Sequence, residues 1–89
     1  MQVIARRTLK QFWKRHPQAE TSLRAWYAAV SAAGWDGPAD IRAAFNSADF
    51  LADNRVIFNI GGNRFRLIVH VSYVYRRVLV KFVGTHAEY

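Results

Sequence analysis

A change in the spacing of the apolar residues near residue 55 constrains the fold of this 89-residue chain more than any other feature. Before that point apolar side chains recur at the three- and four-residue intervals of a helix, as in Leu23, Trp26 and Val30. From Arg55 onward they alternate with the period of two that is typical of strands. A run of helices followed by a run of strands indicates an α+β fold, in which the helices pack on one face of a small antiparallel sheet.

The N-terminal half of the chain predicts three helices. Thr8 and Gln11 match the capping box of a helix start. Pro17 suits the first turn of a longer helix, and Gly34 suits its end. The predicted elements are an edge strand over residues 3–5, a helix from Thr8 that buries Leu9, Phe12 and Trp13, a helix between Pro17 and Gly34 with the stripe Leu23, Trp26, Tyr27 and Val30, and a short helix from Pro38.

Gly61 and Gly62 predict a β-hairpin, because adjacent glycines supply the positive φ angles of a two-residue turn. A turn of that length dictates the pairs across the two strands. The predicted pairs are Phe58 with Phe65 and Val56 with Leu67 on one face, and Asn59 with Arg64 and Ile57 with Arg66 on the other.

A further strand is predicted over residues 77–83. Alternation directs Val78, Val80 and Phe82 towards the helices. Lys81 then falls on the opposite face, near Ile68. The sheet is therefore expected to have an apolar inner face and a basic outer face. The outer face is predicted to carry Arg55, Asn59, Arg64, Arg66, His70 and Lys81.

The positive charge of that face needs an explanation, because the sequence places no acidic residue among these positions. The whole chain has a formal net charge of +7. Arg presents a rigid fork of donors that matches phosphate oxygens, so we expect the face to bind a nucleic-acid backbone rather than only to be solvated. An acidic protein segment would suit the same charge. The tyrosines beside it, Tyr73, Tyr75 and Tyr89, could stack on unpaired bases.

The same face could also cleave RNA without a metal ion. That reaction needs a group that takes the proton of the ribose 2′-hydroxyl, a group that protonates the leaving oxygen, and cations that neutralise the phosphate. The candidates for proton transfer are His70 and His86, and also Lys81 and Tyr89 where the environment shifts their pKa. Arg64 and Arg66 suit the phosphate.

The last residues of the chain repeat the capping-box spacing. Thr85 and Glu88 are three residues apart, and the pattern predicts a single turn directly after the last strand. That turn would hold His86 and Tyr89 over the end of the basic face.

Several other classes of protein lack their required residues here. The chain has no Cys, and its three scattered His show no metal-ligand spacing. A helix-turn-helix interpretation of residues 8–33 fails because both helices carry buried aromatic stripes. The sequence shows neither a signal peptide nor an apolar run of membrane-spanning length. We expect one domain over residues 1–89, cytoplasmic, without cofactor or metal.

Two stretches of the chain resemble a known family. Phe58-Asn59-Ile60-Gly61-Gly62-Asn63-Arg64-Phe65-Arg66-Leu67 and Phe82-Val83-Gly84-Thr85-His86-Ala87-Glu88-Tyr89, with Phe12-Trp13 and Leu23-Arg24-Ala25-Trp26-Tyr27 before them, are similar to the HigB toxins of type II toxin–antitoxin systems. The resemblance implies a RelE-like fold and an mRNA endonuclease, often ribosome-dependent, that a helix-turn-helix antitoxin of the HigA type neutralises. On the matching positions it implies a site of Asn63, Arg66, Lys81, His86 and Tyr89, with Arg64 and His70 beside them.

The residues by themselves leave two other functions open. The basic face could bind RNA or an acidic protein segment without catalysis. The chain could also be a purely structural interaction domain whose charge is incidental.

Overall fold

The structure is a computed structural model and describes residues 1–88. In chain order its elements are β1 (Gln2–Ile4), α1 (Arg6–Arg15), a 3₁₀ turn (Pro17–Ala19), α2 (Glu20–Ala32), α3 (Pro38–Ala44), β2 (Asp49–Phe50), β3 (Arg55–Ile60), β4 (Phe65–Ser72), β5 (Arg77–Thr85) and a second 3₁₀ turn (His86–Glu88). Within these residues no helix combines the length and the apolar character that crossing a membrane requires.

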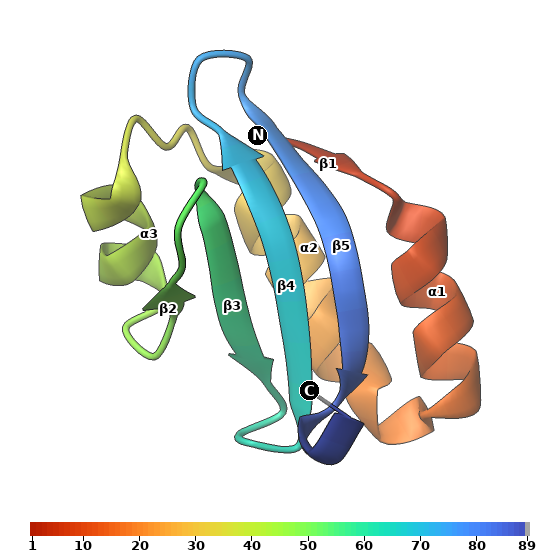
Figure 1. Cartoon of the computed structure of the whole chain (residues 1–89). Helices are drawn as coiled ribbons and strands as arrows, with labels where there is room; N and C mark the ends of the chain where they lie inside the picture. The colour runs from red at the N-terminus through yellow and green to blue at the C-terminus, as the bar shows by residue number, and fades with distance from the viewer. Residues whose placement is uncertain (89) are drawn as a thin grey trace.

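The strands form one sheet in the order β1-β5-β4-β3-β2. In Figure 1, α2 lies behind this sheet, α1 lies beside its β1–β5 edge and α3 lies beside its β2 edge. Over the described residues the front of the sheet carries no helix. The arrangement confirms the predicted α+β fold and the predicted edge strand. It departs from a purely antiparallel sheet in one respect, because β1 runs parallel to β5.

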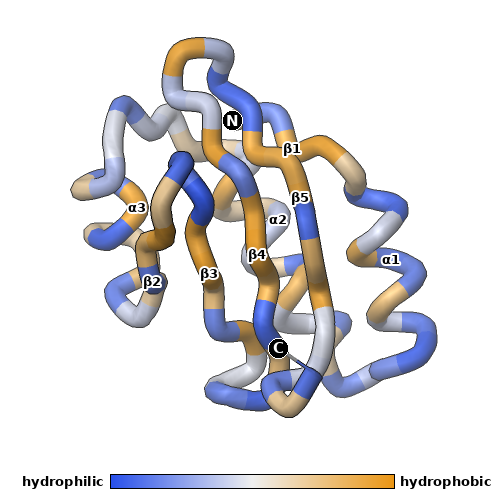
Figure 2. The backbone as a smooth tube through the Cα atoms, in the orientation of Figure 1, coloured by the Kyte–Doolittle hydropathy of each residue, from blue (hydrophilic) through white to orange (hydrophobic). Residues whose placement is uncertain are grey.

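The core lies between the helices and the inner face of the sheet. The predicted stripes on α1 and α2 are buried, apart from Tyr27, which is half-buried. Figure 2 shows a hydrophobic stretch along the middle of β4 with hydrophilic residues on either side of it. Phe58 of β3 occupies the centre of an aromatic cluster. Its ring lies 5.0 Å from Phe45, 5.5 Å from Trp26 and 6.4 Å from Trp35, measured between ring centroids.

Helix α1 begins two residues before its predicted start. Ala5, with a φ of 79°, turns the chain from β1 into the helix, and no side chain caps that end. Thr8 lies inside the first turn, where its N–H donates to the Ala5 carbonyl at 3.1 Å. The capping-box prediction at Thr8 is therefore wrong. The pairing of β1 with β5 decides where the chain must turn, and local sequence cannot show that pairing.

The hairpin between β3 and β4 has a four-residue turn, residues 61–64, in place of the predicted two-residue turn. Gly61 and Gly62 do adopt positive φ angles, of 62° and 70°. The predicted register is wrong by two residues, but side chains alternate with a period of two, so the strand residues keep their predicted faces. Arg64 leaves the strand for the turn. The observed pairs include Ile60 with Phe65, Asn59 with Arg66 and Phe58 with Leu67.

A β-bulge interrupts β5 at Lys81. Val80 pairs with Val69 and Phe82 pairs with Ile68, so Lys81 is the extra residue between two successive pairs. One extra residue reverses the facing of everything after it. Val83 consequently packs against the core, and Phe82 joins Ile68 on the outer side of the sheet. The prediction that Phe82 faces the helices is wrong, whereas the prediction that Lys81 lies near Ile68 is confirmed.

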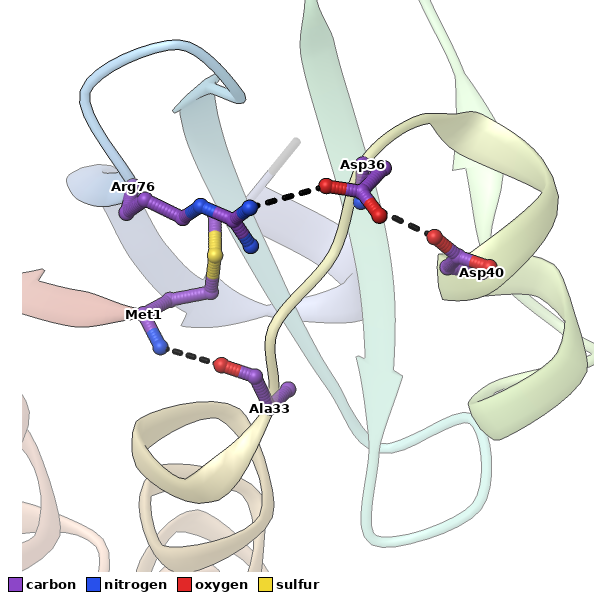
Figure 3. A network of polar contacts seen from close by, with 5 residues as sticks. All are labelled: Met1, Ala33, Asp36, Asp40 and Arg76. Atoms are coloured by element: carbon purple, nitrogen blue, oxygen red, sulfur yellow. Dashed lines mark hydrogen bonds and ion pairs between the residues drawn. The ribbon is translucent and has the colours of Figure 1, made fainter.

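The start of the chain is tied to the connection between α2 and α3. The Met1 ammonium donates to the Ala33 carbonyl, and the Gln2 N–H donates to the Arg76 carbonyl at 2.7 Å. The Arg76 guanidinium pairs with the Asp36 carboxylate at 2.9 Å (Figure 3). These contacts hold the end of the sheet at which β4 turns into β5.

Candidate active site on the open face

We call the helix-free side of the sheet the open face. Ile57 and Ile68 face this side, each buried to more than nine-tenths although neither joins the core cluster. They pair with each other across β3 and β4, and Ile68 pairs with Phe82 of β5. An apolar row therefore crosses the open face and separates two groups of polar side chains.

The first polar group joins Arg66 of β4 to His86 of the C-terminal turn. The guanidinium Nη2 lies 2.7 Å from the imidazole Nε2. A guanidinium can only donate, so Nε2 accepts this hydrogen bond and the neutral ring carries its proton on Nδ1. The backbone N–H of His86 donates to the Arg64 carbonyl at 2.9 Å. The side-chain bond thus joins two residues that are 20 positions apart in the sequence, and the main-chain bond fixes His86 to the neighbouring Arg64.

The turn that carries His86 is closed by the predicted pair of residues. Glu88 Oε1 accepts the backbone N–H of Thr85 at 2.7 Å. This bond is the main cause that holds the pKa of Glu88 below its ordinary value, followed by the Thr85 hydroxyl, with smaller effects from His16 and Arg15. Because the pKa of Glu88 is lowered, the ionised carboxylate stabilises the turn fully above the ordinary pKa of Glu. This stabilisation is lost as the pH falls through the lowered pKa.

Removal of the Glu88 carboxylate is expected to loosen this turn. In Glu88→Ala the Thr85 N–H loses its acceptor, so its hydrogen should exchange with solvent faster. Glu88→Gln keeps an acceptor oxygen and should exchange close to the wild-type rate. Hydrogen exchange followed by NMR measures both. An unchanged Thr85 rate in Glu88→Ala would contradict the capping bond.

The second polar group surrounds a hollow of about 520 Å³ on the open face. Ile68 and Phe82 supply apolar wall, and two permanent cations outweigh one carboxylate around the rim. The residues that line the hollow are Asp53, Arg55, Ile68, His70, Lys81 and Phe82. Apolar wall beside positive charge suits a ligand that has both a flat ring and an anionic group, as a nucleotide does.

The structure therefore places the predicted site residues in several different parts of the sheet and its turns. Arg66 meets His86, while Arg55, His70 and Lys81 share the hollow. The Asn59 amide instead donates to the Ser47 carbonyl at 3.2 Å and ties β3 to the segment before β2. Asn63 and the side chain of Arg64 are exposed in the β3–β4 turn. The prediction for Tyr89 lies outside the described residues.

Two residues of the hollow, Asp53 and Phe82, are not predicted to lie on the open face. Asp53 precedes β3 in a left-handed conformation, with a φ of 60°, and brings a carboxylate to a face that the sequence predicts to lack one. The sequence signal for Asp53 is its place in the turn-forming stretch directly before β3. Phe82 was assigned to the core because strict alternation ignores the bulge. Its ring also covers Gly84, where a Cβ atom would stand 2.4 Å from the Phe82 Cζ.

Comparison with known proteins identifies the family. Residues 19–89 match the HigB toxin family, described as the RelE-like toxic component of a toxin-antitoxin system. The chain is 28% identical to "mRNA interferase HigB" of Escherichia coli O6:H1 and 30% identical to "mRNA interferase toxin HigB" of Escherichia coli K12. The "mRNA interferase HigB" of Shigella flexneri is likewise 30% identical. Each alignment covers the whole chain and 88% of the relative. The chain therefore belongs to the HigB family of RelE-like toxins, the toxic components of toxin–antitoxin systems.

Proposed function

We propose that this toxin is an mRNA interferase, an endoribonuclease that cuts mRNA and so inhibits translation. The observation that carries the proposal is the hydrogen bond between Arg66 and His86 on the open face, next to a basic hollow. A donor-only cation beside a neutral imidazole supplies the phosphate-binding group and the proton acceptor that RNA cleavage requires.

The reaction we infer begins when a phosphate oxygen of RNA takes the place of His86 on the Arg66 guanidinium. The Nε2 lone pair that accepted from Arg66 then becomes available to the ribose 2′-hydroxyl. His86 removes that proton, and the 2′-oxygen attacks phosphorus. The P–O5′ bond breaks, and the leaving oxygen takes a proton from an acid, for which Tyr89 is our candidate. The products are a 2′,3′-cyclic phosphate and a 5′-hydroxyl.

The hollow would hold a nucleotide next to the cleaved bond. Ile68 and Phe82 offer an apolar wall for a base, and Arg55 and Lys81 offer charge to its phosphate. Lys81 also adds positive charge to the transition state. His70 and Asp53 contribute hydrogen-bonding groups at the same rim. In this scheme Asn63 and Arg64 contact RNA from the β3–β4 turn. Asn59 acts indirectly, because its amide holds the segment before β2 against β3.

The partners we infer are mRNA, bound on the ribosome, and a helix-turn-helix antitoxin of the HigA type in the same cytoplasm. We infer a mechanism without a metal ion, in which Arg66 supplies the positive charge and His86 the proton acceptor.

The proposal is tested by incubating the purified chain with mRNA in the presence and absence of ribosomes. Cuts that appear only with ribosomes would support ribosome dependence. Attack by the 2′-oxygen predicts 2′,3′-cyclic phosphate ends and no cutting at a 2′-O-methylated ribose. Folded wild-type protein that leaves mRNA intact under both conditions would overturn the enzyme proposal. Ends that carry a 5′-phosphate would overturn the chemistry.

A non-catalytic module is the second candidate, because the same basic face would bind RNA or an acidic segment. Salt-sensitive RNA binding without cleavage products would favour it.

A further inference from the structure

The tip of the hairpin between β4 and β5 exposes apolar surface that the fold does not use. Val74 is 85% exposed and Tyr75 is 72% exposed, whereas the next most exposed large apolar residue of the described chain, Ile4, is at 36%. Figure 2 shows a hydrophobic segment in this outermost loop. The neighbouring Tyr73 is only half-buried and packs against the core, so Tyr75 is the tyrosine of the pair that the loop presents. Val74 and Tyr75 are adjacent, so the tip offers one small apolar surface that the fold itself does not bury.

The loop is braced at its base. The Arg76 carbonyl accepts the Gln2 N–H, and the Arg76 guanidinium pairs with Asp36, whose own N–H donates to the Asp40 carboxylate at 2.9 Å (Figure 3). The Tyr75 N–H donates to the Ser72 hydroxyl at 3.3 Å. The backbone on both sides of the exposed ring is therefore anchored, and the charge of Arg76 is matched by an acid.

A second arginine accompanies the exposed ring. The Arg77 guanidinium carbon lies 5.6 Å from the centroid of the Tyr75 ring. Arg77 pairs with Ser72, and it precedes the inward-facing Val78, so it belongs to the open face. An aromatic ring with a guanidinium over it is the pairing that single-stranded nucleic acid uses for base stacking and phosphate contact.

This pair occupies the end of the open face opposite to the candidate active site. Arg77 and His86 are nine positions apart along β5, which corresponds to roughly 30 Å along a strand. The cation Lys81 lies between these two ends, at the hollow. The open face is thus long enough to contact several nucleotides, with the active site at one end.

We propose that the hairpin tip is a second RNA-contact site, at which Tyr75 stacks on an unpaired base and Arg77 contacts the adjoining phosphate. The proposal rests on the RNA substrate of the proposed function. Continuity with the basic open face favours an RNA strand over an apolar protein surface. The unpaired base comes either from the mRNA that is being cut or from ribosomal RNA, and the two sources share the same chemistry.

The test measures binding, separately from cleavage. The probes are fluorescent 2′-O-methyl RNA oligonucleotides, which the proposed mechanism does not cut, and purified ribosomes. Tyr75→Ala should weaken binding about 5- to 150-fold, the range expected for one lost base stack. Tyr75→Phe keeps the ring and Val74→Ala removes only a neighbouring apolar group, so both should bind like the wild type.

The binding measurements distinguish mRNA from ribosomal RNA as the source of the stacked base. Loss of affinity for a long oligonucleotide, with unchanged affinity for one too short to reach the tip, assigns the base to mRNA. Loss only on ribosomes assigns it to ribosomal RNA. Tyr75→Ala that binds both like the wild type, or that loses affinity only for the antitoxin, overturns the inference. Wild-type protein that binds through Tyr75 but never cuts mRNA would sink the proposed function and leave this inference standing.

Discussion

His86→Ala is expected to lower the rate of mRNA cleavage by about 10²- to 10⁴-fold, the usual cost of losing a general base. His86 is exposed, so the folded structure should survive. The substitution removes the proton acceptor and also the partner of the Arg66 guanidinium. Single-turnover cleavage of a labelled mRNA on ribosomes measures the rate, and thermal unfolding checks that the variant is folded.

Two further variants separate the roles of the pair. His86→Gln places an acceptor oxygen near the position of Nε2, so it can still hold Arg66, but it cannot move a proton. It should be as inactive as His86→Ala, and recovery of activity would show that His86 only positions Arg66. Arg66→Ala should also abolish cleavage. Arg7→Ala removes the same charge from an exposed position of α1, which is not part of the open face, and should cut like the wild type.

Phe58→Ala is expected to lower the free energy of unfolding by about 3–5 kcal/mol, the range for deleting a buried phenyl ring. Phe58 is 1% exposed, and its ring contacts Phe45, Trp26 and Trp35. A small domain has only about 5–15 kcal/mol in total, so much of its stability would be lost. Urea unfolding followed by tryptophan fluorescence measures the change.

The matched control for this cavity is Phe58→Leu, which keeps most of the volume and should cost about 1.5 kcal/mol or less. Tyr75→Ala removes an exposed ring and should change the free energy of unfolding by no more than about 0.5 kcal/mol. A loss below 1 kcal/mol in Phe58→Ala would contradict its place at the centre of the aromatic cluster.

The helices and their buried faces could be predicted because they depend on local spacing. Leu9, Phe12 and Trp13 are buried as one stripe of α1, although the helix begins before its predicted cap. The face of each residue on β3 and β4 could also be predicted. An error of two residues in the register leaves the alternation intact, so Arg66 and His70 stay on the open face.

Alternation fails where the backbone adds a residue. The bulge at Lys81 exchanges the faces of Phe82 and Val83, and with them the wall of the hollow. A bulge depends on how β4 and β5 fit together, so it cannot be read from β5 alone. For the same reason the parallel pairing of β1 with β5, which sets the start of α1, had no local signal.

The class of fold, the apolar and basic faces of the sheet and the turn closed by Thr85 and Glu88 could all be predicted from the sequence, because each follows from interactions between residues close in the chain. The contact of His86 with Arg66, and the exposure of Tyr75 while Tyr73 packs against the core, depend on how the elements pack together. Those contacts join segments far apart in the sequence, and their geometry depends on strand register, bulge position and turn length together.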